Sequence, residues 1–197
     1  GSLGWRVSEE PFMRGLNQIS ETKLRVSYGL SGNNAFADNY PYVSILRPDN
    51  YSFNNTLVNG LAPATLANSR LGWEKNQQFD LGIDVGLFNN RIYLIADYYH
   101  RITKDLLLSV NVPSLTGFTT AYKNIGKMEN KGWEFAINTR NTTKGIVWNT
   151  TANLSFNRNK VLALGPTGDP IRTTSGSISE INITQIGAPI GSFYGYK

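Results

Sequence analysis

The chain has 197 residues, of which 40% are hydrophobic, 12% aromatic and only 17% charged. Soluble globular domains usually carry about 25% charged residues, and the Asn, Thr, Ser, Gly and Tyr that replace them here suit wet β-sheet faces and turns better than helices. The formal net charge is +5, but the Lys and Arg residues are scattered, which argues against nucleic-acid binding, and the absence of cysteine excludes disulfides and thiol chemistry.

The first part of the chain alternates apolar and polar residues over positions 2–8 and 23–30. Successive side chains of a strand point to opposite faces, so both stretches predict strands with one apolar and one polar face. The connection from Glu9 to Glu21 is expected to hold a helical turn near Glu10–Met13. A long loop is predicted over Ser31–Gly72, and its aromatic residues either stack on a bound substrate or pack within the loop. They are Phe36, Tyr40, Tyr42, Tyr51 and Phe53.

The clearest alternation runs from Trp73 to Phe88, where one row is aliphatic or aromatic and the other carries carboxylates and glycines. A looser repeat follows over residues 91–103, with Ile95 as an exception on the polar row. The intervening Asn89-Asn90 tolerates positive φ and predicts a tight hairpin. The lone histidine, His100, falls on the apolar row, which favours packing over a catalytic or metal role.

Two further strands are predicted over Met128–Arg140 and residues 148–157, joined by a turn at Asn141–Gly145. Short connections then alternate with long ones, the latter being Ser31–Gly72, Asp105–Lys127 and Asn159–Pro189. This alternation is typical of outer-membrane barrels, which have short periplasmic turns and long extracellular loops.

The alternating runs exceed the usual 5–6 residues of a sandwich strand and approach the about 9–11 that cross a bilayer. Aromatic residues are expected near strand ends, where membrane meets water. They are Trp73, Phe88, Trp148 and Phe156. We therefore predict an all-β fold, an antiparallel transmembrane β-barrel of which this chain supplies roughly six to seven strands.

In such a barrel the polar row faces the lumen. The lumen-facing candidates for substrate contact are Asp80, Asp84, Asp97, Tyr99 and Glu134. Paired carboxylates also serve glycoside hydrolysis, but strand periodicity already explains these. We predict no catalytic, cofactor-binding or metal-binding residue and hence no enzyme.

Several stretches resemble barrel signatures of the SusC/RagA family of TonB-dependent outer-membrane transporters. The first pair is Leu71-Gly72-Trp73-Glu74-Lys75 with Gln78-Phe79-Asp80-Leu81-Gly82, and Asn90-Arg91-Ile92-Tyr93-Leu94 running on to Thr103-Lys104-Asp105-Leu106-Leu107. The others are Asn124–Glu134, Gly187–Lys197 and Leu3–Gly29. They follow one another in the family's order over nearly the whole chain.

The resemblance implies a plugged 22-stranded barrel in the outer membrane of a Gram-negative bacterium, importing oligosaccharides or peptides. It also implies a SusD-like surface lipoprotein as lid, TonB acting through a plug, and contact with the lipid bilayer and lipopolysaccharide. Residues 1–197 are expected to be part of the barrel domain, with no plug domain and no signal peptide among them. Two alternatives remain open at this point, namely a soluble β-sandwich that binds glycans and a small complete barrel acting as an adhesin.

Overall fold

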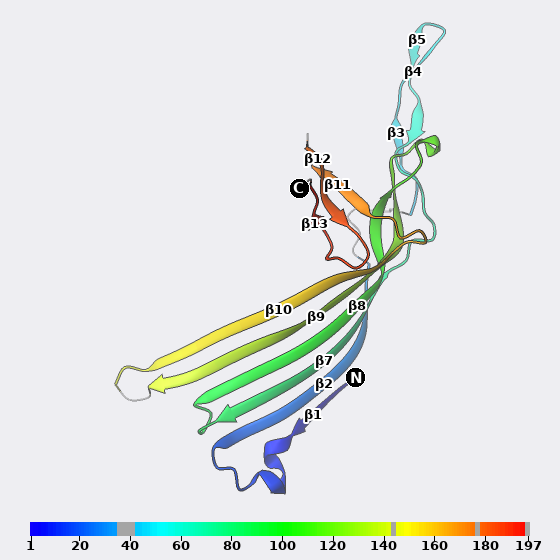
Figure 1. Ribbon diagram of the computed structural model, residues 1–197. Helices are drawn as coiled ribbons and strands as arrows, with labels where there is room; N and C mark the ends of the chain where they lie inside the picture. The colour runs from blue at the N-terminus through cyan, green and yellow to red at the C-terminus, as the bar shows by residue number, and fades with distance from the viewer. Residues whose placement is uncertain (35–41, 143–144, 176–177, 196–197) are drawn as a thin grey trace.

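The main feature of the computed structural model is an antiparallel sheet of six strands in the order β1-β2-β7-β8-β9-β10 (Figure 1). The structure describes residues 1–34, 42–142, 145–175 and 178–195. The six strands are β1 Ser2–Arg6, β2 Ile19–Asn33, β7 Glu74–Leu87, β8 Ile92–Asn111, β9 Thr120–Thr142 and β10 Trp148–Leu164. Spatial neighbours follow one another along the chain, so the sheet is a meander. It curves without closing, and its strand number confirms the prediction.

The connections at one end of this sheet are short. Two 3-10 turns, η1 Val7–Glu9 and η2 Pro11–Met13, join β1 to β2 and confirm the predicted helical turn. Between β7 and β8, Phe88, Asn89 and Asn90 have φ of 54°, 57° and 58°. Asn enters this left-handed region more easily than most residues, which explains the tight hairpin predicted there.

The connections predicted over Asp105–Lys127 and Asn159–Pro189 were wrong in part. Strand β8 continues to Asn111, β9 already begins at Thr120, and β10 continues to Leu164. Alternation was hidden because β8 bulges at Asp105, whose φ is 57°, so that the register against β9 shifts there. Because β10 is longer than predicted, Phe156 lies inside the strand and not at its end. The turn predicted at Asn141–Gly145 lies partly outside the described residues.

Small sheets occupy the other end of the molecule (Figure 1). They pair β3 Leu46–Pro48 with β6 Leu61–Pro63, β4 Tyr51–Phe53 with β5 Thr56–Val58, and β12 Ile178–Thr184 with both β11 Ile171–Ser175 and β13 Ser192–Phe193. The short turn η3 Ser114–Thr116 lies between β8 and β9. Tyr51 and Phe53 are 53% and 68% exposed, so much of both rings is uncovered, and the Tyr51 ring lies against Gly60 of the same loop. Tyr42 is also exposed, and Phe36 and Tyr40 lie outside the described residues.

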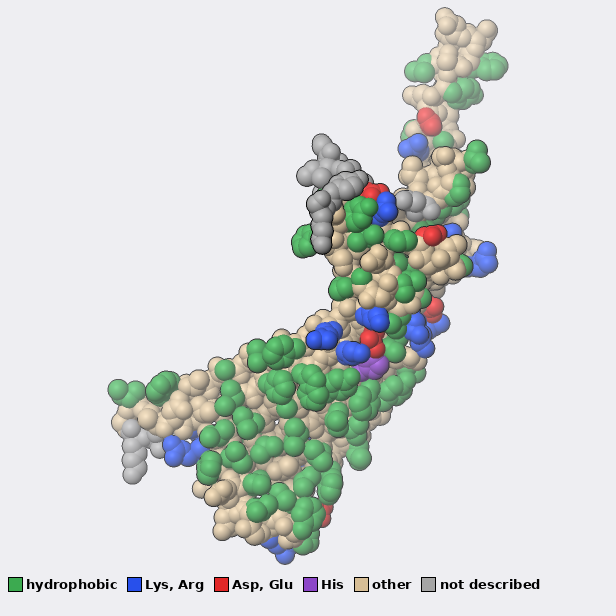
Figure 2. Space-filling view, viewed as in Figure 1, with side chains coloured by type: hydrophobic (Ala, Val, Ile, Leu, Met, Phe, Trp, Pro, Cys, Tyr) green, Lys and Arg blue, Asp and Glu red, His purple; other side chains and the backbone are tan. Residues whose placement is uncertain are grey.

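One face of the six-stranded sheet is apolar across all its strands, and we call it the apolar face. Cross-strand pairing aligns two complete rows, Leu3-Val26-Leu81-Tyr98-Trp133-Phe156 and Trp5-Leu24-Ile83-Ala96-Phe135-Leu154. Their large side chains are exposed, as with Leu81 at 48% and Leu154 at 56%. Figure 2 shows the resulting continuous hydrophobic area.

No second layer of described residues covers this face. The buried apolar side chains among the described residues are Ala121, Val161 and Leu164, which lie at the far end of β9 and β10. A β-sandwich buries its apolar rows against a second sheet, and that arrangement is not seen here. No helix within the described ranges is long and apolar enough to cross a membrane.

The apolar face has the height of a bilayer. From Phe79 to Leu87 strand β7 rises roughly 27 Å at about 3.4 Å per residue, and a strand tilt of about 35–45° projects this to roughly 19–22 Å, close to the about 25 Å apolar band of outer-membrane barrels. The border of the apolar face toward the small sheets, called its upper border, is formed by the row Tyr28-Phe79-His100-Lys131-Arg158. On β9 and β10 this row carries the cations Lys131 and Arg158 in place of apolar side chains. The apolar face therefore ends where charge begins.

The two faces predict opposite responses to the same substitution. Leu154→Arg, at mid-height on the apolar face, is expected to destabilise the protein in lipid by about 2–4 kcal/mol, because arginine is poorly tolerated at the bilayer midplane. Asn153→Arg, its neighbour on the opposite face, is expected to cost less than about 1 kcal/mol. Denaturant unfolding of the complete barrel in lipid vesicles measures both. Equal losses would contradict the assignment of faces.

Candidate functional site

The opposite face of the sheet, the polar face, holds the candidate functional site. Its central rows are Gly4-Arg25-Gly82-Asp97-Glu134-Ser155 and Ser2-Ser27-Asp80-Tyr99-Gly132-Asn157. The residue alternation of each strand places these side chains opposite the apolar rows. Polar residues from up to six strands thus meet in one patch.

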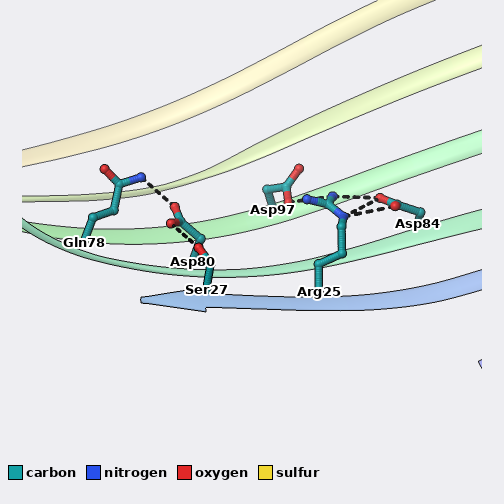
Figure 3. Close-up of polar contacts among 6 residues, drawn as sticks. All are labelled: Arg25, Ser27, Gln78, Asp80, Asp84 and Asp97. Atoms are coloured by element: carbon teal, nitrogen blue, oxygen red, sulfur yellow. Dashed lines mark hydrogen bonds and ion pairs between the residues drawn. The ribbon is translucent and has the colours of Figure 1, made fainter. Parts of the chain in front are cut away.

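An arginine holds two carboxylates at the middle of this patch (Figure 3). Arg25 on β2 donates Nε and Nη2 to Asp84 on β7, at 3.0 Å to Oδ2 and 2.7 Å to Oδ1. The same Nη2 lies 2.9 Å from Oδ1 of Asp97 on β8. Asp84 is only 8% exposed, so this forked contact supplies the charge compensation that a buried carboxylate requires.

Glycine makes the crossing possible. Arg25, Gly82 and Asp97 are cross-strand partners, and the guanidinium passes over Gly82 to reach Asp97. A Cβ at position 82 would overlap the Asp97 carboxylate and approach the Arg25 Cζ to 2.8 Å. Glycine is therefore required here by close approach of side chains and not by backbone conformation.

A second chain of hydrogen bonds centres on Asp80 (Figure 3). Ser27 Oγ donates to Asp80 Oδ2 at 3.0 Å, and Gln78 Nε2 donates to Asp80 Oδ1 at 2.7 Å. Arg101 Nε in turn donates to Gln78 Oε1 at 2.8 Å. Both oxygens of Asp80 thereby accept a hydrogen bond, and Arg101, which is exposed, belongs to the same chain of contacts.

Tyr99 lies across β9 in the same manner. A Cβ at Gly132 would meet the Tyr99 hydroxyl oxygen at 2.8 Å, so the ring covers this glycine, and the hydroxyl donates to Asn157 Oδ1 on β10 at 2.9 Å. An aromatic side chain laid over a strand glycine also helps to fix register. Glu134 lies one row away, and no described residue gives it a hydrogen bond or ion pair.

These residues surround an open hollow of about 580 Å³ on the polar face. Its lining residues are Arg25, Ser27, Gln78, Asp80, Asp97, Tyr99, Arg101, Asn130, Glu134 and Asn157. The lining carries three carboxylates against two guanidinium groups, with one aromatic ring. Such a surface suits hydroxyl-rich or amide-rich ligands, or another polar surface of the same protein.

Across the described ranges no three His, Cys, Asp or Glu side chains are grouped so as to hold a metal ion. His100 lies on the apolar face, where Nε2 contacts Glu129 Oε1 at 2.8 Å.

All five residues predicted to face a lumen lie on the polar face. Asp80, Asp97, Tyr99 and Glu134 line the hollow, whereas Asp84 lies beside it and contacts Arg25. Whether they bind substrate stays a prediction. Sequence reasoning missed Ser27, Gln78, Asn130 and Asn157, which are unremarkable as single polar residues and become identifiable only through strand register.

Other parts of three resembling motifs, outside the residues that line the hollow, meet at the end of the sheet nearest the small sheets. Asn124 Nδ2 donates to the carbonyls of Gly72 and Asp105, both at 2.8 Å, while its Oδ1 accepts from Gly72 N. Lys75 Nζ lies 2.8 Å from the Asp105 carboxylate, and Glu74 accepts from Leu107 N. Three motifs thus fasten the bulge of β8 to the connection that precedes β7.

The last motif is attached in the same region. Asn159 accepts a hydrogen bond from Ile190 N at 2.9 Å and donates to Asn130 Oδ1 at 2.8 Å. Val161 and the segment 187–188 exchange backbone hydrogen bonds. The motifs therefore help to hold the connections at this end of the sheet in place, which their spacing alone does not reveal.

The family model described as TonB dependent receptor-like, beta-barrel matches residues 1–184. TonB-dependent receptor P3 of Formosa agariphila is 39% identical, with the match covering 100% of this chain and 20% of that protein. TonB-dependent receptor SusC of Bacteroides thetaiotaomicron is 33% identical, over 100% of this chain and 21% of SusC.

Solved structures agree with these relatives. The structure of the RagAB peptide transporter superposes with a TM-score of 0.83 at 30% identity, covering 98% of this chain and 20% of that chain. The RagAB peptide importer in its "open-open" state gives a TM-score of 0.80. The chain thus spans about a fifth of the length of the proteins it resembles.

The crossing over Gly82 predicts a position-specific effect of adding one methyl group. Gly82→Ala is expected to destabilise the complete barrel by about 1–3 kcal/mol, because the Arg25–Asp97 contact must shift to admit the Cβ. Gly29→Ala, also on the polar face, meets nothing within 4 Å and is expected to be neutral or slightly stabilising. Denaturant midpoints in lipid vesicles compare the two. A neutral Gly82→Ala would contradict the packed arrangement.

Proposed function

Because the chain belongs to the TonB-dependent receptor-like β-barrel family, we propose that it forms one arc of a SusC-type outer-membrane importer in a Gram-negative bacterium. The imported solutes are oligosaccharides or peptides. In this proposal residues 1–197 lie within the barrel domain, and the plug through which TonB acts lies elsewhere in the protein.

One observation carries the proposal. A single sheet has an uncovered apolar face of bilayer height and a hydrogen-bonded, charged polar face. Lipid cannot satisfy backbone polar groups, so a sheet in this environment must pair all its strands and close as a barrel. The apolar face then contacts lipid and the polar face lines a hydrated interior.

The hollow on the polar face supports a role in solute passage. Tyr99 offers a ring and a hydroxyl, Glu134 offers a carboxylate unoccupied by described residues, and Arg101 offers a cation. Together they can contact sugar hydroxyls or peptide groups in succession without a deep pocket that would retain the solute. The same groups suit contact with a plug.

The extracellular end supports a partner above the barrel. The β4–β5 hairpin, which carries the exposed Tyr51 and Phe53, extends beyond the six-stranded sheet, and the small β11–β13 sheet lies at the same end (Figure 1). We propose that this end faces a SusD-like surface lipoprotein. Among the similar proteins, the RagAB peptide importer has structures named for closed and open states.

The membrane assignment predicts an alternating pattern of chemical labelling. The chain has no cysteine, so single cysteines can be placed at Ala152, Asn153, Leu154 and Ser155 of the complete protein. In intact outer membranes a small water-soluble maleimide is expected to label positions 153 and 155 and to spare 152 and 154, which face lipid. Labelling of all four at equal rates would contradict a barrel wall.

The transport assignment predicts an effect of the polar-face aromatic. Tyr99→Ala is expected to lower uptake of labelled oligosaccharides or peptides by about tenfold, the scale of a contact worth somewhat over 1 kcal/mol. Tyr28→Ala, a matched change on the apolar face, is expected to leave uptake unchanged at equal protein levels. Uptake by cells that carry each variant, normalised by immunoblot, is the measurement. Unchanged uptake in Tyr99→Ala would remove this residue from the solute path.

A further inference from the structure

The long connection between β2 and β7 is closed at its base by contacts between its two ends. Asn33, the last residue of β2, donates Nδ2 to Oε2 of Glu74, the first residue of β7, at 2.9 Å. Beside this contact the Trp73 ring lies against Gly32, where a Cβ would approach the ring to 2.8 Å. The two ends of the connection therefore lie side by side. We call residues 32–33 and 72–75 the neck.

Beyond the neck, the strands of this connection pair only with one another. Strand β3 pairs with β6 and β4 pairs with β5, and neither of these two-stranded sheets joins the six-stranded sheet in the part of the chain that the structure describes. Figure 1 shows both extending away from the main sheet, and we call residues 42–66 the arm. Isolated pairs of strands are marginally stable, so the direction of the arm depends on how it is held at its base.

A single side chain, Asn124 on β9, joins the neck to two strands of the main sheet. Its Oδ1 accepts a hydrogen bond from Gly72 N, and its Nδ2 donates to the carbonyls of Gly72 and Asp105, all three at 2.8 Å. Asp105 is the residue at which β8 bulges, so one amide connects β9, β8 and the neck. A side-chain amide carries two N–H donors and one carbonyl acceptor, which is the set of groups that these contacts require.

Two neighbouring contacts hold the same region. Asn68 Nδ2, on the last part of the connection, donates to the carbonyl of Tyr122 on β9 at 2.9 Å. Lys75 Nζ contacts the Asp105 carboxylate at 2.8 Å, but these side chains are 70% and 44% exposed, and ion pairs in water contribute little. Asn124 is half-buried and contacts main-chain groups of two segments, so it is the main attachment of the neck.

We propose that Asn124 is a positioning residue for solute capture, because it fixes the direction in which the arm leaves the sheet. The exposed Tyr51 and Phe53 on the arm are thereby held in one place beyond the end of the sheet. The inference rests on the proposed function, in which solutes enter the barrel from this end. An arm that occupies the competent direction about a tenth of the time lowers the apparent affinity for the solute about tenfold.

The first measurement is uptake by cells that carry the complete transporter, with labelled tryptic peptides and labelled mixed oligosaccharides as the two probes, over a range of concentrations. Asn124→Ala is expected to raise the half-saturating concentration about tenfold and to leave the maximal rate per transporter unchanged, because the hollow on the polar face is intact. Asn149→Ala removes an exposed amide from the other end of the sheet and is expected to change neither value. A lower maximal rate alone, which a merely structural role would give, or equal effects of both variants would overturn the proposal.

The second measurement reports the direction of the arm without reference to transport. Cysteines replace Ser52 on β4 and Leu115 on η3, both exposed, and carry spin labels in the purified complete transporter. The distribution of distances between the two labels is expected to be narrow in the parent protein and in Asn149→Ala, and broad in Asn124→Ala. A broad distribution in the parent protein, or a narrow one in Asn124→Ala, would contradict the role given to Asn124.

A second variant keeps the test independent of folding. Asn68→Ala removes the other amide that joins the connection to β9, and it is expected to broaden the distances and to raise the half-saturating concentration in the same direction. Broadening in neither variant would overturn the proposal even where one of them accumulates poorly. The maleimide pattern on β10 reports the barrel wall separately, so a failed arm attachment and a failed barrel assignment give different results.

Discussion

Hydrogen bonding between neighbouring strands is the constraint on which this structure depends. The chain has almost no buried core, since three apolar side chains are buried among the described residues. What orders it is the ladder of long antiparallel strands, with β8 and β9 paired from Ile92 to Asn111 and from Thr139 to Thr120. A sheet without a covering layer leaves its apolar side to the surroundings, and only lipid makes that arrangement favourable.

The same ladder explains why much of the fold could be predicted from sequence. Successive side chains of a strand point to opposite faces whatever they contact. The apolar and polar faces of residues 74–87 could therefore be assigned from the sequence alone. The Asn89-Asn90 turn predicted a hairpin, so the next strand was expected to run antiparallel to residues 74–87, as β8 does. Prediction failed where local conformation departs from this rule. The positive φ of Asp105 inserts a bulge, and Leu106, Leu107 and Leu108 then conceal the alternation, so a continuous hairpin was interpreted as a long loop.

The candidate site was predictable in part for the same reason. The polar row of each strand could be identified, which placed Asp80, Asp84, Asp97, Tyr99 and Glu134 on one face. The partners of these residues could not be identified, because register between β2, β7 and β8 decides that Arg25 faces Gly82 and Asp97. A shift of the strand register by one residue would pair Arg25 with a different residue of β7. The alternation within a single strand does not determine this register. The hydrogen bonds of Asn124 with Gly72 and Asp105 were likewise not predictable, because they join three segments that are distant in the sequence.

The arginine that passes over Gly82 has a consequence for how this protein can change over evolutionary time. Positions 25, 82 and 97 share one volume, so a side chain gained at one of them has to be matched by a shorter one at another. Position 132, covered by Tyr99, is subject to the same restriction. Relatives that differ here should therefore differ in compensating sets, so the chemistry of the polar face is expected to change at several positions together and not one position at a time.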